Sequence, residues 1–125
     1  MVIFRQSILV LALSGTAFAS AAQTASETFN HLNTATERFS SSTRNVVEAM
    51  HASDYTTACG SGRTALNDLN EIITTRETLI QVMKRENDPA HSKLLSDFEA
   101  DQIRDKEQMK MITERVATIC SKAEM

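Results

Sequence analysis

DYTTACGSGRTAL, residues 54–66, holds two of the chain's three glycines and one of its two cysteines, Cys59. Its Gly-Ser-Gly-Arg-Thr run is close to the end of a phosphate-binding loop, G-x-x-x-x-G-K-[ST]. That loop would need glycine at position 57 and lysine at position 63, where this chain has Thr57 and Arg63. No strand pattern precedes the stretch. It therefore indicates no nucleotide site, and Cys59 becomes its informative residue.

The sequence on both sides of this stretch has the spacing of long amphipathic helices. Apolar residues recur three and four positions apart, which is the period of an α-helix with one buried face. Turn-forming residues are rare, since Pro89 is the only proline of the chain. We expect helices over about residues 25–50 and 54–85, and a third that begins at Asp88-Pro89, a capping residue followed by proline.

The connections between these helices predict how they pack. Residues 51–53 join the first pair and residues 86–87 join the second, and links this short make consecutive helices antiparallel. The expected fold is all-α, an antiparallel up-down-up three-helix bundle made of a long helical hairpin plus a third helix. An extended hairpin that pairs with a second copy of the chain is the alternative.

This topology predicts one disulfide, Cys59–Cys120. The two cysteines lie at similar distances along the chain on either side of the second turn, so antiparallel helices bring them to one end of the bundle. A bridge that closes so long a loop stabilises the fold by about 4 kcal/mol in the chain-entropy model. Gly60 and Gly62 then indicate either a close helix–helix approach beside the bridge, or a kink or helix start near Ser61.

The first residues of the chain, MVIFRQSILVLALSGTAFAS, are typical of a cleaved secretory signal. Arg5 precedes a short apolar run, and small residues surround Ala17 and Ala19. The run is far shorter than the roughly 20 residues that span a bilayer. We expect a signal peptide over residues 1–19, with Ala21 and Ala22 as other cleavage positions. Residues 20–125 would form one helical domain, exported to a periplasm or beyond the cell.

The charge of the chain argues against two classes of partner. The net charge is −3, and loss of the signal with Arg5 makes it −4. Nucleic-acid binding depends on clustered Lys and Arg, and an acidic surface is also repelled by anionic lipid. We expect no nucleic-acid partner and no stable membrane insertion after the signal is removed.

A polar interruption of the apolar pattern is the most unusual feature of the two later helices. Arg76 lies among isoleucines and leucines, and residues 99–108 contain only two apolar residues, Ala100 and Ile103. Counted from the two turns, Arg76 is level with a set of polar residues: His31, Asp101, Gln102 and Asp105. We expect an ion pair of Arg76 with Asp101 or Asp105 that fixes helix register, or an arginine whose head reaches solvent. A small-ligand or anion site lined by Arg76, Gln102 and His31 is the other hypothesis.

Catalytic and metal chemistry find little support in the sequence. Its three histidines, His31, His51 and His91, have no metal-binding spacing, and no C-x-x-C-H haem motif is present. We therefore expect no metal and no cofactor. A catalytic thiol at Cys59 would need a base such as His51, whereas an even number of cysteines in an exported protein is usually paired.

These observations predict a small exported helical protein that acts by binding and not by catalysis. The expected partner is another protein or a second copy of the chain, engaged by a helix face. A periplasmic ligand-binding bundle that uses the polar layer around Arg76 is the first alternative, and an enzyme that uses Cys59 or His31 is the last.

Overall fold

The computed structural model describes residues 24–125, and within this range the chain forms three long helices. The first, α1, spans Ala25–His51, α2 spans Tyr55–Glu86, and α3 spans Ser92–Ala123 after a 3-10 turn, η2, at Pro89–His91. No strand occurs between residues 24 and 125. The all-α up-down-up arrangement expected from the sequence is confirmed. The expected signal peptide over residues 1–19 lies outside the described residues.

Side-chain caps explain where each helix begins. The Thr24 hydroxyl accepts a hydrogen bond from the Glu27 amide at 3.0 Å, and the Thr24 amide donates to the Glu27 carboxylate, so the two residues form a capping box. Asp54 caps α2 by accepting from the Thr57 amide at 3.1 Å. Asp88 and Pro89 initiate η2 and not α3 itself, so the third helix starts a turn later than the sequence indicated.

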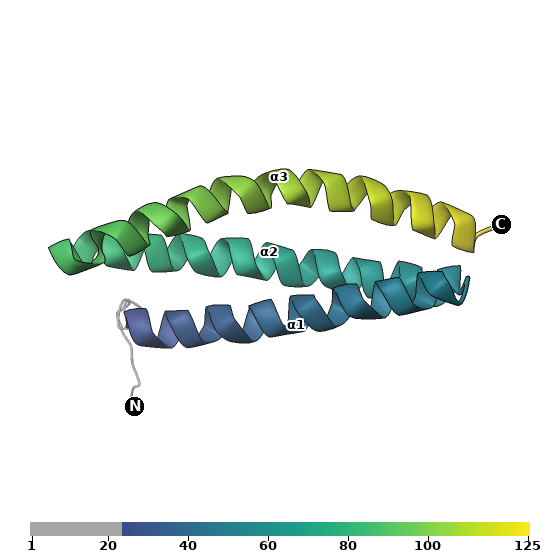
Figure 1. Ribbon diagram of the computed structural model, residues 1–125, viewed down its shortest axis with the longest axis horizontal. Helices are drawn as coiled ribbons and strands as arrows, with labels where there is room; N and C mark the ends of the chain where they lie inside the picture. Colours follow the sequence, from purple (N-terminus) through teal and green to yellow (C-terminus); the bar gives the residue numbers. More distant parts are fainter. Residues whose placement is uncertain (1–23) are drawn as a thin grey trace, which may run out of the picture.

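The middle helix α2 organises the bundle, because α1 and α3 pack along two sides of it (Figure 1). One end of the molecule contains the start of α1 and the α2–α3 connection. The other contains the α1–α2 connection and the end of α3. We call the first the groove end and the second the disulfide end. The α2 helix runs without interruption through Gly60 and Gly62, so neither glycine starts or breaks it.

Two apolar clusters among residues 24–125 differ in size and position. The larger is nearer the groove end and combines residues of all three helices: Leu32, Ala35, Leu69, Ile72, Leu79, Ile80, Met83 and Phe98. The smaller lies at the disulfide end and contains Cys59, Val116 and Cys120. Only α2 and α3 contribute to this smaller cluster, so the two ends of the bundle differ in how they are closed.

Candidate functional site

The residues around Arg76 form a buried polar layer between α2 and α3. Arg76 is 8% exposed, and its Nη1 donates to Asp105 Oδ2 at 2.7 Å and to Gln102 Oε1 at 3.1 Å. Gln102 Nε2 in turn donates to the Ile73 carbonyl at 2.7 Å. The guanidinium is therefore fixed in a charge-assisted contact that joins the two helices at one register.

The other two polar residues expected near Arg76 lie elsewhere. Asp101 forms an ion pair with Arg104 at 2.9 Å on the surface of α3. His31 lies between α1 and α2, where its Nε2 is 2.6 Å from Glu71 Oε2. The structure thus brings together Arg76, Gln102 and Asp105. Of the two aspartates considered for the ion pair, Asp105 is the one that makes it.

A second polar network, which the sequence analysis missed, connects α1 and α2. Arg38 Nη2 contacts Glu71 Oε1 at 2.6 Å and its Nε lies 3.7 Å from Asp68 Oδ1. The buried Ser42 hydroxyl donates to Asp68 Oδ2 at 2.8 Å. With His31 on Glu71, the network extends over much of the α1–α2 interface.

This network shifts the pKa values of Glu71 and Arg38. The hydrogen bond from Arg38, together with the contact of His31, lowers the pKa of Glu71 below its ordinary value, and Glu71 in turn raises the pKa of Arg38. The network therefore holds Glu71 as a carboxylate. The sequence contained one signal for the buried part of this network, which is Asp68. Polar residues recur every seven positions on α2, at Ser61, Asp68 and Thr75.

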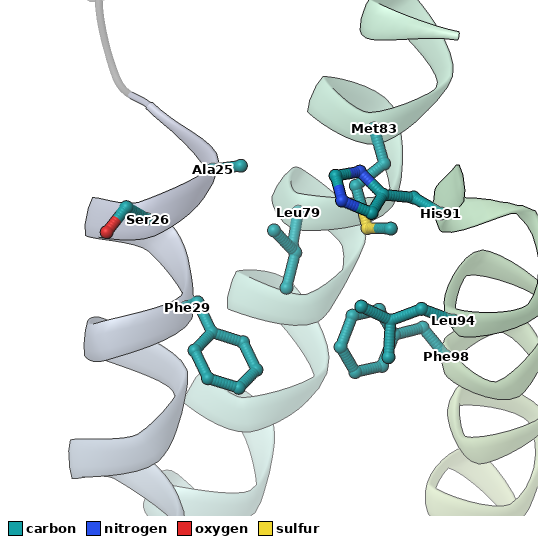
Figure 2. Close-up of a pocket in the computed structure, with 8 residues that line it drawn as sticks. All are labelled: Ala25, Ser26, Phe29, Leu79, Met83, His91, Leu94 and Phe98. Atoms are coloured by element: carbon teal, nitrogen blue, oxygen red, sulfur yellow. The ribbon is translucent and has the colours of Figure 1, made fainter. Parts of the chain in front are cut away.

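An apolar groove shared by several elements lies at the groove end. It encloses about 240 Å³ and is lined by eight residues: Ala25, Ser26, Phe29, Leu79, Met83, His91, Leu94 and Phe98. In Figure 2, Phe29 of α1 and Leu94 of α3 extend toward each other, and Leu79 and Met83 of α2 lie behind them. Three helices thus contribute walls to one opening.

The groove leaves large apolar side chains in contact with solvent. Phe29 and Leu94 are each 43% exposed, although both belong to well-formed helices. The ring of Phe29 also approaches the ring of Phe98, with 6.4 Å between centroids, so α1 and α3 meet here through side chains. The sequence pattern placed Phe29 in the core and left Leu94 off the apolar seam, because helical spacing alone does not say how far two non-consecutive helices diverge.

The disulfide end carries the expected bridge between Cys59 and Cys120, with 4.8 Å between their Cα atoms. Cys59 therefore has no free thiol in this state. A Cβ atom on Gly62 would come within 2.9 Å of Val116 Cγ2, whereas one on Gly60 would meet nothing within 4 Å. Gly62 thus permits the close approach of α3 that the bridge requires.

Two absences apply to residues 24–125 alone. No group of three or more His, Cys, Asp or Glu side chains in this range is placed to hold a metal ion. No helix in the same range is long and apolar enough to cross a bilayer.

Comparison with known proteins adds no further candidate. No protein-family model, curated protein or solved structure matches this chain.

Proposed function

We propose that this chain is an exported protein that binds an apolar segment of a partner protein in the groove formed by α1, α2 and α3. The observation that carries the proposal is the joint exposure of Phe29 and Leu94 over a floor of Leu79 and Met83. Burying such side chains against a partner is favourable by about 25 cal/mol per Å² of apolar surface. Apolar side chains that flank a concave floor are typical of sites for an amphipathic helix.

The size of the groove favours a side-chain anchor over a metabolite. Small-molecule pockets usually enclose about 300–1,000 Å³ and contain several polar groups that orient the ligand. This groove encloses about 240 Å³, and Ser26 and His91 are its only polar lining residues. Interfaces obtain much of their affinity from a few large side chains inserted in such hollows. One or two apolar anchors of a partner helix are therefore the proposed occupants.

The polar layer supports the ligand-binding alternative less well. Nη1 of its arginine already donates to Asp105 and Gln102. Nε has no partner among residues 24–125 but is fully buried, so an anion would have to open the layer and break the pair with Asp105. Breaking such a pair costs several kcal/mol because one charge stays buried and unpaired. We therefore assign the layer a structural part, the fixing of α3 register.

Export is part of the proposal and rests on two observations. The first residues of the chain have the pattern of a secretory signal. The chain also contains a disulfide, and such bonds persist mainly in oxidising compartments.

The test is site-specific photocrosslinking of the oxidised mature domain, residues 20–125, in the envelope or secreted fraction of its source cells. A photoreactive phenylalanine analogue replaces Leu94 in the groove, and Ile103 in the matched control. Ile103 is an equally suitable control because it is an exposed apolar residue of the same helix, 65% accessible, outside the groove.

The proposal expects one protein adduct from position 94 that is absent from position 103 and is lost when Phe29→Asp is added. The same adduct from both positions would contradict it, as would a position 94 that captures nothing. A crosslink to a second copy of this chain would show that the groove serves self-association, and the proposed partner protein would be wrong.

A further inference from the structure

The attachment of α3 to α2 consists of two separate contact regions. The first contains Phe98, Gln102 and Asp105, which are buried against the main core and the Arg76 side chain. The second contains Val116 and Cys120 at the disulfide end. From residue 106 to residue 115 no side chain is fully buried, although Met109 and Ile112 are partly covered. Ile112 packs against both clusters, so the two buried regions are joined by partly covered side chains alone.

The second contact region is small for the length of helix that it holds. Val116 and Cys120 are the only buried residues of α3 beyond residue 105, and α1 contributes nothing to their cluster. Helix ends that bury little surface open locally at low cost in free energy. Beyond these two residues, the last turns add the partly buried Ile119 and Ala123 and the Lys122 ammonium, which lies 5.4 Å from the centroid of the Tyr55 ring. The disulfide is therefore the main constraint that keeps these turns on α2.

The first contact region does not depend on the disulfide. It includes a buried ion pair, Arg76 with Asp105 at 2.7 Å, and its Phe98 shares a cluster with both other helices. The α1–α2 pair has its own caps, core and polar network. Loss of the disulfide would thus leave most of the bundle in place.

We propose that the Cys59–Cys120 bond is a redox latch, whose reduction releases the last three turns of α3, about residues 113–123, without unfolding the bundle. Both cysteines belong to the small buried cluster at the disulfide end, where each keeps 8% exposure. The released state exposes Val116 and the α2 surface around Gly62 and Leu66, an apolar face that the oxidised protein covers. This face is distinct from the groove, which is at the opposite end.

The chemistry is thiol–disulfide exchange with a dithiol reductant. A reductant thiolate attacks one cysteine sulfur, forms a mixed disulfide and releases the other cysteine as a thiolate. The second thiol of the reductant then displaces the bound cysteine. Two electrons and two protons pass to the protein, which ends with two thiols, and the reductant ends as a disulfide.

The test is amide hydrogen exchange of the mature domain, residues 20–125, before and after reduction with dithiothreitol. Exchange is expected to accelerate at least tenfold in residues 113–123, and less than threefold in residues 92–105 and 25–51. Reoxidation should restore the original rates. The double variant Cys59→Ser, Cys120→Ser serves as control, because it should exchange like the reduced protein and not respond to dithiothreitol.

Two results would overturn the latch. Unchanged protection of residues 113–123 after verified reduction would show that noncovalent contacts suffice there. An equal acceleration in all three helices would show that the bond supports the whole fold and not one segment. Both results are independent of the groove, so the proposed binding function would stand or fall separately.

Discussion

The two interfaces of α2 solve the same packing problem in different ways. Toward α1, the helix presents one half-exposed acid, Glu71, and one buried acid, Asp68, to the exposed Arg38 of the neighbouring helix. Toward α3, it buries a charge, Arg76, against Asp105, and adds a covalent bridge at one end. The first interface can lose one contact and keep the others. The second interface depends on one polar layer for its register and on one disulfide to hold its end together. Single substitutions there should therefore lower the free energy of unfolding more.

The largest expected effect is at the buried layer. Arg76→Ala leaves Asp105 and Gln102 buried without their donor, and we expect a loss of about 3–5 kcal/mol in the free energy of unfolding. Lys84→Ala is the matched control on the same interface, since its exposed ion pair with Glu99 of α3 should contribute less than about 1 kcal/mol. Urea denaturation of both variants measures the difference. An equal effect of the two substitutions would remove the distinction between buried and exposed charge.

The next effect compares two glycines at the disulfide end. Gly62→Ala brings a methyl group against Val116, and the required shift of α3 should cost about 1–3 kcal/mol. Gly60→Ala enters open space and should stabilise α2 by about 0.5–1 kcal/mol, because alanine favours the helix more than glycine does. Thermal unfolding of the two variants should shift in opposite directions. Stabilisation by both would contradict the close approach of α3.

A smaller effect is expected in the α1–α2 network. Ser42→Ala removes the hydroxyl that donates to Asp68 and should cost about 1 kcal/mol, since Arg38 still faces the carboxylate. Ser41→Ala, at an exposed neighbouring position, is the control and should change the free energy of unfolding little. If Ser42→Ala lowered the free energy of unfolding as much as Arg76→Ala does, the two interfaces of α2 would be equally sensitive to the loss of one polar contact, which contradicts the comparison.

The smallest effect concerns pH. The pKa of Glu71 is lowered in the folded state from an ordinary value of 4.5, chiefly by the hydrogen bond from Arg38. The unfolded chain then binds the proton at higher pH than the folded one. The resulting stability is fully present above pH 4.5 and is lost as the pH falls through the lowered pKa.

Glu71→Gln tests this sign. The variant should be less stable than the wild type at neutral pH, and the difference should shrink as the pH falls below 4.5. The same substitution at Glu107, an exposed residue of α3, should show no such convergence. If the difference in stability between wild type and Glu71→Gln grew toward low pH, the pKa of Glu71 would not be lowered in the folded state.

Local patterns were enough to predict the helices, their order and the bridge, because each depends on spacing along one chain. Asp88 and Pro89 indicated a helical start through their capping chemistry, one turn ahead of α3, and Cys59 and Cys120 could pair in only one way. The groove was not predictable in this way. Its opening depends on the angle between α1 and α3, which are not consecutive, and helical spacing leaves that angle undetermined.

The polar residues also differ in how far the sequence could place them. Arg76 stood out because a charge interrupted an apolar seam, and antiparallel counting limited its partner to Asp101 or Asp105. The same count gave the height of His31 along the bundle but not its partner, Glu71, because height along a helix does not specify the direction of a side chain. Asp68 was overlooked because its apolar neighbours defined the seam and its own stripe is polar.

The most direct test of the account is a nuclear Overhauser measurement on the oxidised mature domain with labelled phenylalanines. The proposed binding site requires that α1 and α3 meet around the groove. The ring centroids of Phe29 and Phe98 lie 6.4 Å apart there. Cross-peaks between the ring protons of these two residues are predicted. Cross-peaks from Phe98 to α2 alone, with none to Phe29, would mean that α1 and α3 do not enclose a groove and would contradict the proposed binding site.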